Sequence, residues 1–313
     1  MKEELIISGR MNYKVDPTLH IWGWEIPLYL FLGGLAAGIL FFAALYFLRG
    51  KENQYQFAVK WIPMYTPFFL IIGLGALFLD LHHKLYFWRL YTSIKLQSPM
   101  SWGAWTLMVV TPLSMVWSAT YVRELYPKWD WKLKWIFDLE TFLIKNRRTL
   151  AWIMIVYAVI LGTYTGILLS AFNSRPLWNT SILGPLFLVS GLSAGAAMIM
   201  MLSKNPAERT KFSQIDLLLI AIELTLIIHM FMGFRASTQV QIDAAAMFLG
   251  GPYTLPFWVF VVFMGMILPA FLEFWELKGN HIPAYIPGVL IIFGSIMLRF
   301  IIVYAGQASR YLY

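Results

Sequence analysis

The sequence predicts an all-α integral membrane protein that crosses the bilayer eight times, and three observations support this prediction. Of the 313 residues, 59% are apolar and only 13% are charged, against about 25% charged in a typical soluble domain. Apolar windows of about 20 residues, each long enough to cross the hydrocarbon layer as a helix, recur along the chain. The alternating pattern of membrane β-strands is absent, which excludes a transmembrane barrel.

The windows divide the chain into two sets of four spans. They lie at 24–48, 61–82, 102–123, 150–172, 181–203, 214–236, 254–274 and 285–305. An arm over 1–23 precedes them, and it lacks the short apolar core and cleavage site of a signal peptide. We expect a first four-helix bundle over 24–172, a linker over 173–180 and a second bundle over 181–313.

The positive charges between the windows predict how the chain is oriented. Fourteen of the 24 Lys and Arg residues lie in the loops after the first, third, fifth and seventh spans: Arg49, Lys51, Lys60, Arg123, Lys128, Lys132, Lys134, Lys145, Arg147, Arg148, Lys204, Arg209, Lys211 and Lys278. The positive-inside rule makes these loops cytoplasmic and both termini external. The net charge of +8 therefore reflects membrane topology, and we expect lipid rather than nucleic acid around the chain.

The first and fifth spans begin with similar segments. Residues 27–30 (PLYL) lead to 34–38 (GLAAG), and residues 185–188 (PLFL) lead to 191–195 (GLSAG). Because both segments open odd-numbered spans, they favour two parallel four-helix repeats. The alternative is two independent faces of small residues, which let helices approach closely.

The absence of cysteine limits the redox chemistry of this protein. Without cysteine it can hold no thiolate-bound iron–sulfur cluster, no covalent c-type haem and no disulfide. A two-haem membrane cytochrome needs four axial histidines at matching depths. Only His82 or His83 and His229 fall at membrane depth, and they are not level. We therefore expect no haem.

Ionisable residues inside the predicted spans are few, and each is costly in lipid. They are Glu25, Asp80, His82, His83, Glu223, His229, Arg235, Glu273 and Arg299. Most fall in the outer half of the membrane, whereas Glu223 lies about 20 Å down, near its middle. The distribution predicts a polar pocket that opens outward, with one carboxylate leading inward. In the structural alternative, Arg235 and Arg299 extend to the interface while Asp80 and the histidine pair cap helix ends.

Several segments resemble a known family. Residues 24–38 (WEIPLYLFLGGLAAG) resemble the opening of the polysulfide reductase membrane subunits of the NrfD/PsrC type. So do residues 98–105 (SPMSWGAW), 164–170 (YTGILLS), 175–179 (RPLWN), 298–300 (LRF) and 305–307 (AGQ). These segments keep the order of the family and are spread over almost the whole chain.

The resemblance implies a haem-free, quinone-reactive subunit of a respiratory oxidoreductase in a bacterial or archaeal cytoplasmic membrane. The cofactor would be a quinone, either menaquinone or ubiquinone. The implied partners are a ferredoxin-like iron–sulfur subunit and a catalytic subunit of the molybdopterin or multihaem type. The charge distribution puts these soluble partners on the external, periplasmic face. Iron–sulfur clusters and molybdopterin would belong to these partners alone.

The expected site combines this resemblance with the chemistry of quinones. The resemblance places the pocket tyrosine at Tyr164, eleven residues before Arg175. Where some members carry a histidine, this protein has Tyr29, with Glu25 one helical turn earlier. Reducing a quinone takes two electrons and two protons, so the pocket needs hydrogen-bond donors and proton-exchanging groups.

We assign three expected roles on this basis. The catalytic residues are Tyr164, Glu25 and Asp80. The quinone-binding residues are Tyr29, His82, His83, Tyr164, Arg175, Trp178, Asn179 and Arg299. The proton path contains Asp80, Glu223, His229, Arg299 and Glu273.

Two other functions are compatible with the sequence. A secondary transporter or ion channel equally uses a parallel repeat and buried acids. The clustering of ionisable residues in the outer half, however, leaves few polar groups for a continuous path. The second possibility is a non-catalytic anchor with a silent pocket.

Overall fold

The computed structural model describes residues 22–129, 133–280 and 282–311, and within these ranges the protein is helical and contains no β-strand. Eight segments are long and apolar enough to cross a membrane. They are α2 (Glu25–Leu48), η1 to α3 (Phe57–Asp80), α5 (Pro99–Leu125), α7 (Arg147–Ser170), α8 (Leu183–Leu202), α9 (Pro206–Arg235), η4 with α11 (Pro256–Leu277) and α12 (Tyr285–Ala308). The predicted all-α, multi-pass membrane fold is confirmed. Most of the expected arm, residues 1–21, lies outside the described residues.

Two span boundaries differ from the predicted ones. Helix α3 (Thr66–Asp80) ends at Asp80, where Leu81 turns to an extended conformation with φ −67° and ψ 122°. His82 and His83 therefore follow the span instead of lying within it. Helix α9 begins at Pro206 rather than near residue 214, because the Asn205 side chain accepts a hydrogen bond from the amide of Ala207 at 3.1 Å and caps the helix. The first two turns are polar, so the hydropathy window misses them.

Short helices lie between the spans and were not predicted. They are η3 (Lys84–Tyr86), α4 (Arg89–Thr92), α6 (Lys134–Lys145) and α10 (Gln239–Ala246). None of these segments contains an apolar window of membrane length, which is the only signal that a hydropathy pattern provides.

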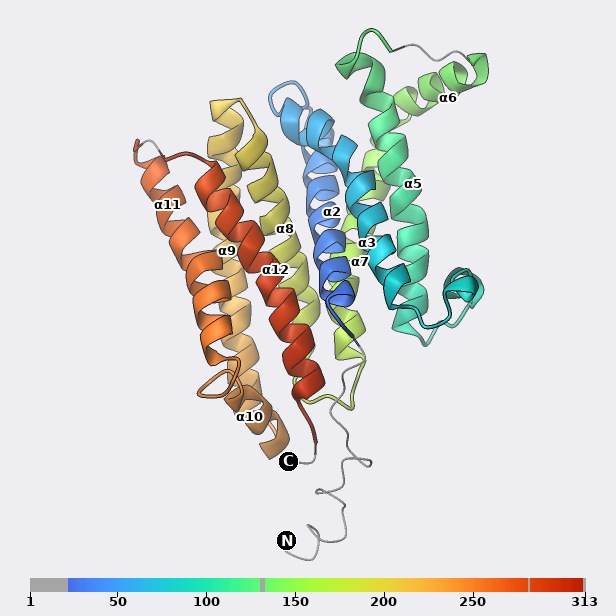
Figure 1. The fold of residues 1–313 in the computed structure, drawn as a ribbon. Helices are drawn as coiled ribbons and strands as arrows, with labels where there is room; N and C mark the ends of the chain where they lie inside the picture. Colours follow the sequence, from blue (N-terminus) through green and yellow to red (C-terminus); the bar gives the residue numbers. More distant parts are fainter. Residues whose placement is uncertain (1–21, 130–132, 281, 312–313) are drawn as a thin grey trace, which may run out of the picture.

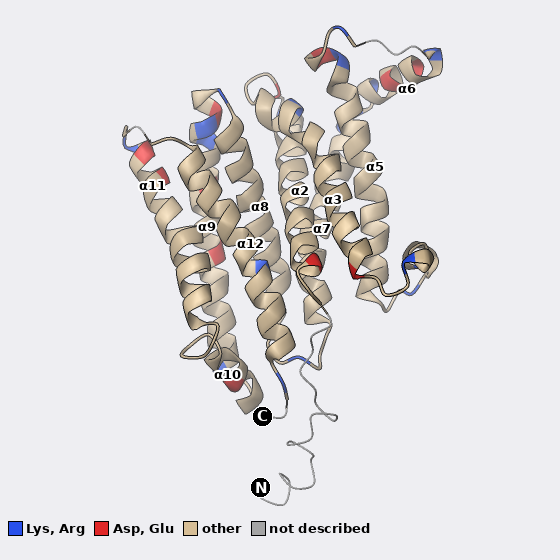
Figure 2. Ribbon diagram, viewed as in Figure 1, with Lys and Arg blue, Asp and Glu red and all other residues tan. Residues whose placement is uncertain are grey.

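The membrane helices stand side by side in two groups (Figure 1). Helices α2, α3, α5 and α7 pack against one another, as do α8, α9, α11 and α12, and α2 and α7 both contact α8. Helix α2 begins and α12 ends at the same end of the bundle, which we call the pocket end. We call the other end, where α2, α5, α8 and α11 finish, the basic end. Figure 2 shows charged residues gathered at the basic end and only isolated ones between the ends.

Helices α2 and α8 run in the same direction and cross through glycines. A Cβ atom at Gly191 would lie 2.6 Å from the carbonyl oxygen of Gly34, and one at Gly195 would lie 2.7 Å from the carbonyl carbon of Gly38. The two similar sequence segments therefore face each other across this crossing, where small residues allow backbone contact. The close approach supports the interpretation that these segments are packing faces of small residues. That the two bundles are parallel repeats stays a prediction.

We expect Gly191→Leu to destabilise the bundle, because its side chain would have to displace the backbone of α2. Overpacking of this kind typically costs about 1–3 kcal/mol, so the melting temperature of the purified protein should fall. Gly233→Leu is the matched control, since Gly233 of α9 is exposed and a Cβ there meets nothing within 4 Å. Equal melting temperatures for the two variants would contradict the assigned crossing.

Candidate functional site

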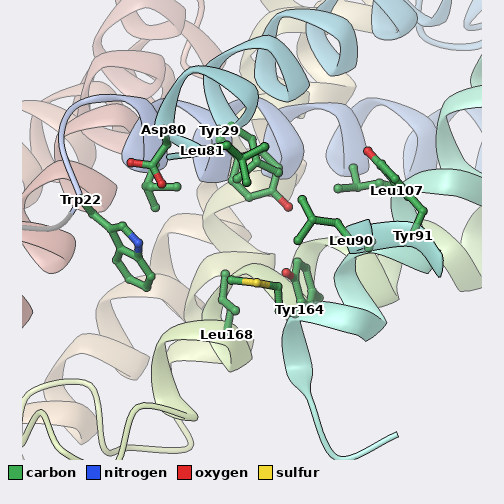
Figure 3. A pocket seen from close by; sticks show the side chains of 13 residues that line it. Trp22, Tyr29, Asp80, Leu81, Leu90, Tyr91, Leu107, Tyr164 and Leu168 are labelled. Carbon is green, nitrogen blue, oxygen red and sulfur yellow. The ribbon is translucent and has the colours of Figure 1, made fainter. Parts of the chain in front are cut away.

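A pocket lies among α2, α3, α5 and α7 near the pocket end. Its cavity volume is about 90 Å³. It is lined by Trp22, Ile26, Tyr29, Leu77, Asp80, Leu81, Leu90, Tyr91, Met100, Ala104, Leu107, Tyr164 and Leu168 (Figure 3). The walls are mainly apolar, and the polar groups are few and come from different helices.

Two buried tyrosines form the polar centre of the pocket. The side chains of Tyr29 on α2 and Tyr164 on α7 both enter the pocket, and their hydroxyl groups interact electrostatically (Figure 3). The ring of Tyr164 rests against Gly103 of α5, where any Cβ atom would overlap it. Each hydroxyl group is able to donate a hydrogen bond to a ligand.

A carboxylate and a third tyrosine complete the polar groups. Asp80 is the last residue of α3 and interacts electrostatically with Glu25 and His82. Tyr91 comes from α4, outside the membrane spans, and burial raises the pKa of its hydroxyl. Tyr91 is therefore protonated at neutral pH and able to donate a hydrogen bond. The sequence analysis missed Tyr91, because the loop that carries it has no span-like pattern.

Three of the other expected residues lie near the pocket but do not line it. Glu25 is the first residue of α2, and its negative charge stabilises the N-terminus of that helix. His82 and His83 line a separate surface recess together with Arg89 and Lys95. The expected ligand set thus divides between the pocket and the adjoining surface.

Arg175, Trp178 and Asn179 tie the linker to the end of α12. Nη1 of Arg175 donates to the carbonyl oxygen of Ser309 at 2.9 Å, and Nε1 of Trp178 donates to that of Ile302 at 2.9 Å. The amide of Asn179 reaches the hydroxyl of Tyr311 at 3.4 Å. The Trp178 ring also lies 5.3 Å, centroid to centroid, from that of Trp22, which lines the pocket. Trp178 therefore supports a pocket wall instead of facing the cavity.

Arg299 is buried between helices, away from the pocket lining. Its guanidinium donates to the carbonyl oxygens of Leu30 at 3.3 Å, Phe187 at 3.2 Å and Ser295 at 2.7 Å. It also donates to the hydroxyl of Ser190 at 3.1 Å. These acceptors belong to α2, α8 and α12, so Arg299 connects the two groups of helices.

Three buried acids continue from Arg299 toward the basic end. Glu223 lies beside the Ser190 hydroxyl and interacts electrostatically with Arg299. Asp216, which comes before Glu223 on α9, accepts a hydrogen bond from Ser193 at 2.6 Å and interacts with both Glu223 and Glu273 of α11. Among the described residues, Asp216 Oδ2 and both carboxylate oxygens of Glu273 have no hydrogen-bond partner.

The sequence analysis missed Asp216 and misplaced His229 relative to these acids. Asp216 and Glu223 are seven residues apart, so they share one helix face, and this spacing could have revealed the pair. His229 instead has an exposed ring whose Nδ1 lies 2.8 Å from the carbonyl oxygen of Thr225. Within the part of the sequence that the structure describes, no group of three or more His, Asp or Glu side chains is arranged to hold a metal ion.

Comparison with known proteins gives concordant matches along the sequence. The family model described as Polysulphide reductase, NrfD matches residues 11–309. The protein is 33% identical over 307 residues to Protein NrfD of Escherichia coli, a match that spans 92% of this sequence and 96% of that protein. It is 30% identical over 302 residues to one of the polypeptides of the polysulfide reductase of Wolinella succinogenes, with 92% and 94% of the two sequences matched.

A more distant relative extends the comparison to another named reductase. The protein is 24% identical over 334 residues to one of the polypeptides of the selenate reductase of Mesobacillus selenatarsenatis, a match that spans 95% of this sequence and 76% of that one. Because the family model spans nearly the whole described bundle and two relatives reach 30% identity or more, this chain belongs to the NrfD/polysulphide reductase family.

Proposed function

We propose that this protein is the membrane anchor and quinone-binding subunit of an oxidoreductase complex, in which it exchanges electrons between the quinone pool and an iron–sulfur partner subunit. The pocket carries the proposal, because it combines apolar walls with the hydroxyls of Tyr29, Tyr91 and Tyr164 and the carboxylate of Asp80. Two relatives are named as components of a polysulfide reductase and of a selenate reductase, and they support a place in such a complex.

The donor set of the pocket fits a quinone head group. A bound quinone supplies chemistry in which two electrons and two protons are exchanged. The side chains of Ile26, Leu107 and Leu168 provide flat apolar walls and exclude water. The O–H of Tyr29 or of Tyr164 donates to a carbonyl oxygen, and the Asp80 carboxyl group holds or releases a proton at the mouth.

The electrons must come from or pass to another polypeptide. Because this sequence contains no cysteine, a thiolate-bound cluster has to lie on a partner. The recess beside the pocket presents His82, Arg89 and Lys95 at the surface, and we assign it to the docking face of a ferredoxin-like subunit. A molybdopterin or multihaem subunit completes the complex and acts on the terminal substrate.

The charge distribution orients the complex. The basic end carries the loops with most of the positive charge and therefore faces the cytoplasm. The pocket end and the soluble partners then lie on the external side of the bacterial or archaeal membrane.

The buried acids favour a second role, proton exchange between the pocket region and the basic end. Arg299 donates to the carbonyl oxygen of Leu30, the residue after Tyr29. Arg299 also interacts with Glu223, the first acid of the series. Glu223 and Asp216 are about 10 Å apart along the helix axis, so water would have to bridge them. Glu273 continues the series toward the end of α11.

We expect Tyr164→Phe to weaken quinone binding, since it removes one hydroxyl and preserves the shape of the ring. The loss of one hydrogen bond corresponds to about 0.5–1.5 kcal/mol, or about two- to tenfold in affinity. Titration of the purified protein with a short-tailed benzoquinone and a short-tailed naphthoquinone measures this directly. Tyr157→Phe, on the same helix and outside the pocket lining, is the control. Wild-type affinity in the Tyr164 variant would contradict the assigned pocket.

The orientation predicts opposite accessibility of two introduced cysteines. Asn173→Cys lies in the exposed loop after α7 at the pocket end, and Lys128→Cys lies in the exposed loop after α5 at the basic end. An impermeant thiol reagent should label position 173 in intact cells and position 128 only after permeabilisation. The reverse result would place the pocket on the cytoplasmic side.

Asp216→Asn should separate proton movement from electron transfer, because the amide keeps the acceptor for Ser193 but cannot titrate. In sealed vesicles containing the whole complex, we expect quinone turnover to continue while proton uptake from the basic-end side falls. Asp138→Asn, at an exposed position on α6, controls for loss of a charge. Unchanged proton uptake in the Asp216 variant would make the acids structural.

A further inference from the structure

Helix α6 (Lys134–Lys145) leaves the bundle sideways at the basic end (Figure 1). It connects two membrane spans, since α5 ends at Leu125 and α7 begins at Arg147. Both ends of the connection are therefore held near the membrane surface, and the helix between them lies close to the headgroup region.

The residues of α6 are segregated by polarity around the helix. At 100° per residue, Trp135, Leu139 and Phe142 share one face. Lys134, Asp138, Thr141 and Lys145 lie on an adjoining polar face, about 100° around the helix. The rest of the protein does not cover the apolar face, because Trp135 is 64% and Phe142 is 62% exposed.

Contacts on the flank of α6 fix it against α5. Nε of Arg123 lies 2.7 Å from a carboxylate oxygen of Glu140, which is buried. The Arg123 guanidinium also lies 4.6 Å from the ring centroid of Phe137. Since Glu140 and Phe137 lie on the side of the helix away from Trp135, Leu139 and Phe142, these contacts leave the apolar face free.

The charges around α6 match an anionic lipid surface. Lys134 and Lys145 stand at its two ends, and Lys128 and Arg148 flank it; all four are exposed. Amphipathic helices with apolar and basic faces lie in the membrane interface, and their cations attract anionic headgroups. Outer residues of the bundle are also apolar and exposed, including Trp152 on α7.

We infer that α6 is an interfacial helix that inserts Trp135, Leu139 and Phe142 at the boundary between headgroups and acyl chains and binds anionic phospholipids through Lys134, Lys145 and Arg148. This role is independent of quinone binding. It gives the basic ends of α5 and α7, two helices that line the pocket, a lateral attachment to the membrane surface.

Two single-cysteine variants test the insertion, and the protein has no native thiols. Leu139→Cys and Thr141→Cys occupy opposite faces of α6, and each is labelled with an environment-sensitive fluorophore. The full-length protein is then placed in vesicles of phosphatidylcholine and phosphatidylglycerol. The label at 139 should shift to shorter wavelength and be quenched by spin-labelled lipid, whereas the label at 141 should do neither. Equal quenching at both positions would overturn the insertion.

The same label tests headgroup binding. The label at position 139 should be quenched at least about twofold more strongly by spin-labelled phosphatidylglycerol than by spin-labelled phosphatidylcholine. The triple variant Lys134→Gln, Lys145→Gln, Arg148→Gln should abolish this preference while its melting temperature stays that of the parent. No preference in the parent would overturn the headgroup assignment. If position 139 is protected from quenching by spin-labelled lipid in the whole complex but not in vesicles with this protein alone, the face belongs to a protein partner instead.

Discussion

The guanidinium of Arg299 is fully buried where α2, α8 and α12 meet. Both groups of helices depend on the hydrogen bonds and the opposite charge that compensate for its burial. A charge at such depth costs at least about 2.5–3.5 kcal/mol when it is unpaired. Three helices therefore supply oxygen acceptors, and Glu223 supplies the opposite charge. The same arginine excludes a side chain at Gly34, where a Cβ would lie 2.8 Å from the guanidinium nitrogen Nη2.

Helix α2 separates the two polar regions that surround this arginine. Leu30 offers its carbonyl oxygen to Arg299, whereas the preceding side chain, Tyr29, enters the pocket among α3, α5 and α7. The acids lie on the other side of α2, on α9 and α11. One helix therefore separates the pocket from the acids, and Arg299 lies between them.

The sequence predicted the eight spans because membrane thickness sets their length, and apolar length is visible in a sequence. It also selected Tyr29, Asp80 and Tyr164, which line one pocket. Hydropathy and spacing report depth but not the direction in which a side chain points, so Arg175, Trp178 and Arg299 were assigned to a pocket that they do not line. Helix α6 was missed because its apolar residues recur with helical spacing over only 12 residues.

The buried acids of the bundle differ in how fully they are hydrogen-bonded. Glu208, at the start of α9, accepts from the amide of Ala58 at 2.8 Å and from the hydroxyl of Ser203 at 2.7 Å. Both of its oxygens are satisfied, as expected of a tie between a loop and a helix. Asp216 and Glu273 are equally buried, yet between them three oxygens lack a partner among the described residues. Fixed ties rarely leave such groups unsatisfied, and a carboxylate with open oxygens is able to change partners, as the proposed proton exchange requires.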